Sequence, residues 1–83
     1  PTESTPSVQL DYWVQAGSFR RQQDADRRRA QLAKLGFSSF IQTVEHGGAA
    51  LRRVRLGPFD RRRAQRIEQR LKANGIDALA LRR

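Results

Sequence analysis

Residues able to bind an anion occur inside a short motif that the chain contains twice. Residues 14–19 (VQAGSF) recur as residues 54–59 (VRLGPF), with Gln15 in the first copy where Arg55 stands in the second. Arg53 lies two positions before Arg55, so both arginines project from the same side of a strand. A guanidinium donates a fork of N–H groups that suits a carboxylate or a phosphate. A glutamine amide pairs with hydroxyl and amide groups. These residue types indicate a ligand that combines negative charge with hydroxyl or amide groups.

Residue types needed for catalysis or metal binding are scarce. The chain has no cysteine and a single histidine, His46, which we expect in a turn. It therefore cannot hold a thiolate site or a histidine-based metal cluster. A histidine in a turn is also not expected to serve a Ser-His-Asp triad. The 8 acidic residues are scattered, without a pair placed for glycosidase chemistry. We expect a binding protein that is not an enzyme and uses no metal or cofactor.

The repeat also predicts the elements that position these side chains, beginning with a β-α-β unit. Residues 10–16 alternate as a strand, and Gly17-Ser18 forms a corner into the first helix. Asp24 is the expected N-cap of this helix, and Gly36 is the expected terminating residue. Residues 37–44 then form the second strand.

The second copy repeats this order after a hairpin turn at residues 45–48, where two glycines supply positive φ. Residues 51–56 form the third strand and residues 57–59 the second corner. Asp60 caps the second helix, and Asn74-Gly75 ends it before the last strand. The order predicts an α+β domain of the βαββαβ, RNP-like or ferredoxin-like type. Its four-stranded antiparallel sheet has both helices on one face and the first and third strands at the centre.

Strand alternation and helical spacing predict two sides for the sheet. The helix-covered side is expected to bury Leu10, Tyr12, Val14, Ala16, Ile41, Val54, Leu56, Leu79 and Leu81 against Ala25, Leu32, Leu35, Ala64, Ile67 and Leu71. The uncovered side is expected to present Trp13, Gln15, Leu51, Arg53, Arg55 and Ala80, with Phe40 nearer the edge. Trp13 there could stack on a sugar ring or a base, or be partly buried at the edge. Gln15 could bind a ligand or simply face solvent.

The charge of the chain points to an anionic partner. Lys+Arg is 17 against 8 Asp+Glu, a net charge of +9, which suits nucleic acid, lipid headgroups or an acidic polysaccharide. Most of the arginines belong to the two predicted helices, where they could equally form a solvated surface. The triplet Arg61-Arg62-Arg63 lies at a helix N-terminus, where the helix dipole disfavours cations. Local helix stability therefore does not account for that triplet.

The motifs resemble those of the SPOR domain, the sporulation-related repeat of bacterial envelope proteins. The resemblance rests on residues 12–19 (YWVQAGSF), 35–37 (LGF) and 53–59 (RVRLGPF), and on Leu71 with Gly75. It covers about residues 10 to 82 and implies an RNP-like fold that binds peptidoglycan, in particular septal glycan strands stripped of stem peptides by amidases. The glycan-binding positions that the resemblance implies are Gln15, Ser18, Leu51, Arg53 and approximately Ala80. Two of them depart from the family pattern, because Leu51 replaces an aromatic residue and Ala80 is smaller than the usual aliphatic one. Trp13 or Phe40 could supply the missing ring.

The resemblance also implies a place in the cell. We expect residues 1–9 to be a disordered linker and residues 10–83 to be the domain. The resemblance implies a parent of the FtsN type, a division protein anchored in the inner membrane that carries this domain at its C-terminus, in the periplasm at the septum, with division proteins as partners. An envelope lipoprotein or another septal protein is the alternative parent. The domain itself is expected to be monomeric. Since RNA-recognition modules share the fold class, nucleic-acid binding through the basic surface is the alternative. The stretch LRRVRLG at residues 51–57 lacks the aromatics such modules need, so no nucleic acid is expected.

Overall fold

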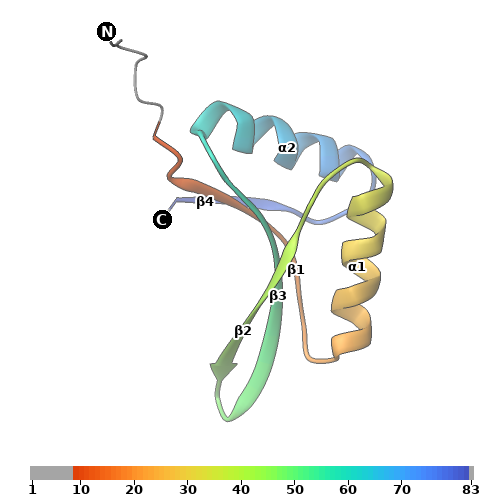
Figure 1. Cartoon of the computed structure of the whole chain (residues 1–83). Coiled ribbons are helices and arrows are strands. Elements are labelled where there is room, and N and C mark those ends of the chain that lie inside the picture. The colour runs from red at the N-terminus through yellow and green to blue at the C-terminus, as the bar shows by residue number, and fades with distance from the viewer. Residues whose placement is uncertain (1–8, 83) are drawn as a thin grey trace, which may run out of the picture.

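The structure, a computed structural model, describes residues 9–82, and within them the chain forms four strands and two helices (Figure 1). In chain order these elements are β1 (Tyr12–Phe19), α1 (Gln22–Lys34), β2 (Phe40–His46), β3 (Ala49–Phe59), α2 (Arg61–Ala73) and β4 (Leu79–Arg82). The α+β class and the βαββαβ order are as predicted. The predicted linker at residues 1–9 lies outside the described residues, apart from Gln9. No helix in the described part of the chain is long and apolar enough to cross a membrane.

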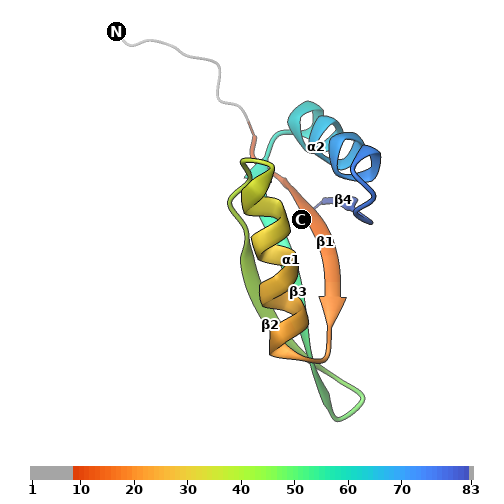
Figure 2. The ribbon, with the colours of Figure 1, turned by 90° about the vertical axis from the view of Figure 1, so that its right-hand side faces the viewer.

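The strands form one antiparallel sheet in the order β2-β3-β1-β4, which places the two motif-bearing strands at the centre, as predicted. Both helices pack on the same face of this sheet (Figure 2). The core between the two layers consists of Val14, Ala16, Ala25, Leu32, Val54, Leu56, Ala64, Ile67, Leu71, Ile76 and Ala78. We call the opposite side of the sheet, which the helices leave uncovered, the open face.

The two predicted corners, at residues 17–18 and 57–59, are β-bulges inside longer strands. β1 and β3 each continue to the phenylalanine of their motif. At each motif one strand contains one more residue than its partner, and the glycine there has φ of +124° (Gly17) or +128° (Gly57). Glycine tolerates these angles, and a bulge bends a strand without ending its pairing. The glycines therefore mark the corners correctly, but the predicted strand ends were wrong. The core position predicted for Leu10 was also wrong, because Leu10 precedes β1 and is 47% exposed.

The two helices begin differently. α2 begins at the predicted cap, because Oδ1 of Asp60 accepts a 2.8 Å hydrogen bond from the backbone N–H of Arg63. The cap predicted for α1 is wrong, since its N-cap residue is Arg21 and no side chain bonds there. Asp24 instead lies in the first turn of α1, where a carboxylate opposes the positive end of the helix dipole.

Both helices end as predicted, in a Schellman motif with Gly36 or Gly75 at positive φ. This motif also delays the second strand, which starts at Phe40 and not at residue 37. Phe37 is instead the residue after the terminating glycine. It donates its backbone N–H to the carbonyl of Leu32 at 2.9 Å and packs its ring against the core.

The hairpin between β2 and β3 is tighter than predicted. β2 continues to His46, so only Gly47-Gly48 form the turn, with φ of 59° and 81°. Two central residues with positive φ fit the twist of antiparallel strands. Within β2, Ile41 packs against the core, as predicted.

The predicted orientation of β4 is wrong by one residue. Ala80 lies opposite Val14 and packs on the core, and Ala78 is buried. Leu79 and Leu81 lie opposite the open-face residues of β1, and Leu79 remains 54% exposed. Because α2 packs directly on β4, the small alanines fit beneath the helix and the leucines turn outward. Packing against α2 has thus selected the orientation of β4 that buries its less hydrophobic residues.

A carboxylate from α2 holds the free edge of β4. Oε2 of Glu68 accepts a 3.0 Å hydrogen bond from the backbone N–H of Ala80 and lies 3.7 Å from the Nζ of Lys72. The Glu68 side chain is only 19% exposed. An unpaired N–H on an edge strand is a site for unwanted strand pairing, so this contact both satisfies and shields it.

We expect Glu68→Ala to lower the free energy of unfolding by about 1–2 kcal/mol, because it removes a charge-assisted hydrogen bond from a partly buried N–H. Urea denaturation followed by circular dichroism measures this loss. Gln69→Ala is the matched control, since Gln69 is exposed on the same turn, and it should change stability by less than about 0.5 kcal/mol. Equal stabilities for the two variants would show that the Glu68 contact contributes nothing.

Candidate functional site

Pairing of the strands arranges the open-face side chains in rows across the sheet, because directly opposite residues of antiparallel strands project to the same side. One row, from β2 to β4, contains Phe40, Arg55, Gln15 and Leu79. The next row toward the hairpin contains Gln42, Arg53 and Ser18, and beyond it lie Val44 and Leu51. On the other side of the first row Trp13 lies opposite Leu81.

Gln15 and Arg55, at the centre of the first row, are hydrogen-bonded to each other. Nε and Nη2 of Arg55 donate to Oε1 of Gln15 at 3.3 and 3.1 Å. This fork occupies the acceptor of the amide and leaves its Nε2 group as a donor to a ligand. The pKa of Arg55 lies below its ordinary value, first because the side chain is partly desolvated and second because Arg53 carries a like charge. An anion bound beside the pair would offset both effects.

The bulge in β1 decides where Ser18 points. Gln15 lies opposite Arg55 and Ser18 lies opposite Arg53, so β1 advances by three residues where β3 advances by two. Strict alternation would place Ser18 on the helix side together with Val14. The extra residue instead turns the exposed Ser18 hydroxyl to the open face, beside Arg53. Bulge geometry thus places Ser18 next to the arginines.

Arg28 fixes this bulge from the helix side. Its Nη1 donates to the carbonyl oxygen of Ala16 at 3.0 Å, and its guanidinium carbon lies 5.4 Å from the ring centroid of Phe19. Sequence reasoning placed Arg28 on a solvated helix surface and missed this role. Its place in the sequence does not reveal this contact, because an arginine one turn from a buried residue is equally compatible with solvent exposure.

Trp13 and Phe40 form one aromatic pair on the open face, with ring centroids 5.5 Å apart and ring planes at 76°. Trp13 is half-buried and Phe40 is 39% exposed, so the pair presents an apolar surface beside Arg55. Gly57 gives Trp13 its room, because a Cβ at that position would lie 3.1 Å from Trp13 Cε3. Position 51 thus lacks an aromatic ring, and the rings of the open face lie at its opposite end instead.

Five of the seven predicted site residues gather in this central area, namely Trp13, Gln15, Ser18, Arg53 and Arg55. Leu51 lies on the same face but toward the hairpin, opposite Val44. Ala80 is not on the open face, and Leu79 occupies the corresponding place beside Gln15. Sequence reasoning missed Leu79 because it assigned β4 the opposite orientation.

The arrangement offers hydrogen-bond donors and positive charge next to apolar surface, without an acid beside the two central arginines to neutralise them. The single ion pair within residues 9–82 joins Lys72 to Glu68, on α2. In the same residues no group of three His, Cys, Asp or Glu side chains is placed to hold a metal ion. An extended face of this kind suits a polymer that carries hydroxyl, amide and carboxylate groups.

Comparisons with known proteins agree with this geometry. The family model described as SPOR domain matches residues 11–82. The crystal structure of the RlpA SPOR domain from Pseudomonas aeruginosa superposes with a TM-score of 0.76 at 27% identity, covering 87% of this chain and 99% of that one. The solution structure of the peptidoglycan binding domain of the B. subtilis cell wall lytic enzyme CwlC gives a TM-score of 0.69 at 27% identity, covering 98% of this chain and 96% of that one. A search of curated proteins gives no match.

Proposed function

The chain belongs to the SPOR domain family, whose model matches residues 11–82, and we propose that its open face binds peptidoglycan. The peptidoglycan binding domain of CwlC, which has the same fold, supports this ligand. We propose further that the preferred form is the denuded glycan strand, from which amidases have removed the stem peptides.

The observation that carries the proposal is the pair of adjacent rows at the centre of the sheet. One row holds Arg55 bonded to Gln15, and the next holds Arg53 beside Ser18. Removal of a stem peptide frees the lactyl carboxylate of each muramic acid. A denuded strand is therefore a row of anions on a polymer of hydroxyl and N-acetyl groups, which matches cations alternating with neutral hydrogen-bonding groups. The Trp13–Phe40 pair adds a surface on which a sugar ring can pack.

Affinity for this ligand should be modest and should depend on several sugar repeats. Exposed ion pairs contribute only about 0.2–1 kcal/mol each, and the face is open and not a deep pocket. Enrichment at the septum would then follow from the local density of denuded strands. We propose that the domain is a monomeric, non-catalytic targeting module of a membrane-anchored periplasmic protein.

Co-sedimentation of the chain with purified sacculi tests the function directly. Three forms are compared: untreated sacculi, sacculi treated with an amidase, and amidase-treated material digested to disaccharides. We expect binding to rise after amidase treatment, because each removed peptide exposes a carboxylate. Digestion should abolish binding, because a disaccharide carries a single lactyl carboxylate and cannot offer several repeats to the face.

Excess RNA in each reaction separates this function from nucleic-acid binding. A domain that recognises denuded glycan should remain bound to the sacculi when RNA is added. Equal binding to every polyanion, lost with RNA or at moderate salt, would instead mean that the arginines act as a nonspecific basic surface. That result would contradict the proposed function.

A further inference from the structure

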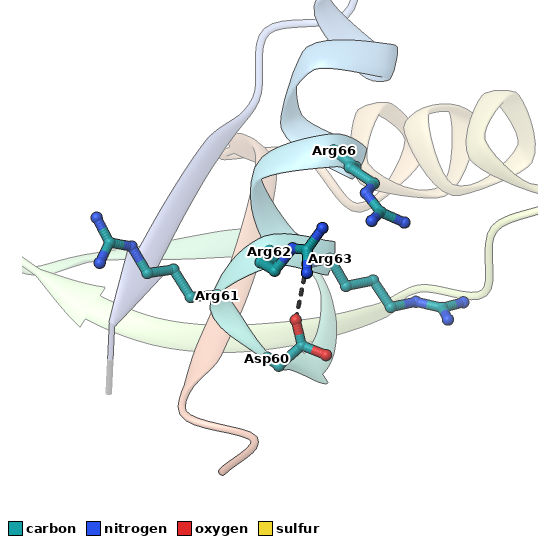
Figure 3. A pocket seen from close by; sticks show the side chains of 5 residues that line it. All are labelled: Asp60, Arg61, Arg62, Arg63 and Arg66. Atoms are coloured by element: carbon teal, nitrogen blue, oxygen red, sulfur yellow. Dashed lines mark hydrogen bonds between the residues drawn. The ribbon is translucent and has the colours of Figure 1, made fainter. Parts of the chain in front are cut away.

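A second basic surface lies on the side of the molecule opposite the open face. Arg62, Arg66 and Arg70 follow one another at intervals of four residues along α2, and all three are exposed. Because α2 buries Ala64, Ile67 and Leu71 against the sheet, Arg62 lies on the far side of the helix. From there the series winds through Arg66 to Arg70 on the flank, where the guanidinium carbon of Arg70 lies 5.5 Å from the ring centroid of Phe37. We call these three residues the outer arginine stripe. Figure 3 shows its N-terminal part, with the Arg66 side chain extending away from the helix axis.

Helix stability does not explain the outer arginine stripe. Like charges four residues apart on a helix repel each other, and α2 contains two such pairs in succession, Arg62–Arg66 and Arg66–Arg70. The nearby acid, Asp60, forms no ion pair with them in the described part of the chain, and the dashed line in Figure 3 joins it to the backbone N–H of Arg63. Within residues 9–82 no stripe arginine forms an ion pair. The repulsion is therefore uncompensated in the free chain and would be relieved by an external anion.

α1 extends this surface in the same layer. It buries Ala25 and Leu32 against the sheet, which turns Arg27 and Lys34 to its outer side. Both are exposed. Figures 1 and 2 show the two helices over different parts of the same sheet face, with α1 on β1 and β3 and α2 reaching β4. Their outer cations therefore spread over the whole helical side of the molecule.

We propose that this outer helical surface docks on an anionic phospholipid bilayer. Charge complementarity is the argument, because guanidinium groups pair well with phosphate and a bilayer presents phosphates over a broad plane. The described large hydrophobic residues that are exposed are Leu10, Phe40 and Leu79, and none belongs to α1 or α2. Protein interfaces depend on apolar and aromatic anchors at their centre, and single-stranded nucleic acid depends on stacking. A layer of cations without such anchors fits headgroups better than either.

This docking is distinct from the proposed glycan binding, because it uses the opposite face. The domain could hold a glycan strand on the sheet while the helices rest on lipid. Without apolar insertion the attachment should be electrostatic, reversible and sensitive to salt.

The test is sedimentation of the 83-residue chain with vesicles of phosphatidylcholine alone or mixed with phosphatidylglycerol. We compare Arg62→Gln/Arg66→Gln with the charge-matched control Arg53→Gln/Arg55→Gln. Both remove two positive charges, and glutamine preserves helix propensity. The helix variant should bind anionic vesicles about thirtyfold more weakly than the unchanged chain, yet still bind amidase-treated sacculi. The sheet variant should bind anionic vesicles as the unchanged chain does, but its binding to amidase-treated sacculi should be weakened.

Two results would overturn the lipid proposal. Equal loss of vesicle binding in both variants would show that only net charge matters. Tighter binding to duplex RNA than to vesicles at equal phosphate concentration, with the same dependence on Arg62 and Arg66, would assign the surface to nucleic acid. Sacculi binding is scored separately in each variant, so failure of the glycan proposal and failure of the lipid proposal are distinguishable.

Discussion

Arg55→Ala is expected to weaken binding to amidase-treated sacculi by about tenfold or more. The substitution removes a cation from the centre of the open face and also frees Gln15, whose Oε1 accepts two N–H groups from Arg55. Arg55 is half-buried, so its hydrogen bonds to an anion contribute more than an exposed ion pair does, about 1.5–3 kcal/mol each. Tenfold corresponds to about 1.4 kcal/mol. Gln15→Ala should have an effect of similar size, because the amide is the other half of the same pair.

Arg55→Lys separates the charge of Arg55 from its geometry. A lysine keeps the positive charge but cannot hold Oε1 of Gln15 with two parallel N–H groups. We therefore expect it to restore less than half of the lost binding energy. Arg27→Ala is the control, since it removes one charge from an exposed position on α1 and should leave sacculi binding unchanged. Unweakened binding of Arg55→Lys to sacculi would show that the cation alone matters and that the contact with Gln15 is incidental.

Gly17→Ala is expected to lower the free energy of unfolding by at least about 2 kcal/mol and to abolish glycan binding. At φ of +124° a residue with a Cβ is strained, and that Cβ would lie 2.7 Å from the ring of Phe19. Strain of this kind contributes about 1–3 kcal/mol, and overpacking adds to it. The ring cannot move freely, because it packs on the core and lies under Arg28. Any relief would reshape the bulge that turns Ser18 toward the open face.

Gly36→Ala is the matched control for this prediction. Gly36 also has positive φ, at +88°, but a Cβ there would meet nothing within 4 Å. Gly36→Ala should therefore lose only the cost of the backbone angle, about 1–2 kcal/mol, and should still bind sacculi. Thermal and urea denaturation of both variants measures the difference. Similar losses in the two would mean that the close packing at Gly17 is unimportant.

Much of the fold was predictable because its signals are local. Asp60 and the two terminating glycines act within a single turn of chain, so their residue types alone identify them. The repeat of residues 14–19 at 54–59 likewise predicted the doubled β-α-β order and the two central strands. The cap of α1 was missed because an acid in the first turn and an acid at the cap leave similar sequence patterns.

The sequence by itself determined the class of the domain and the chemistry of the open face, because residue types and spacing already place Gln15, Arg53 and Arg55 on one side of two neighbouring strands. Tertiary structure alone decided three further matters. The bulge in β1 places Ser18 on that side, and Arg28 donates a hydrogen bond that holds the bulge. The orientation of β4 points Leu79 outward and Ala80 inward. The physical reason is that strand register is set by partners. The alternating alanine and leucine residues at 78–81 can bury either residue type, and the space beneath α2 admits the smaller one.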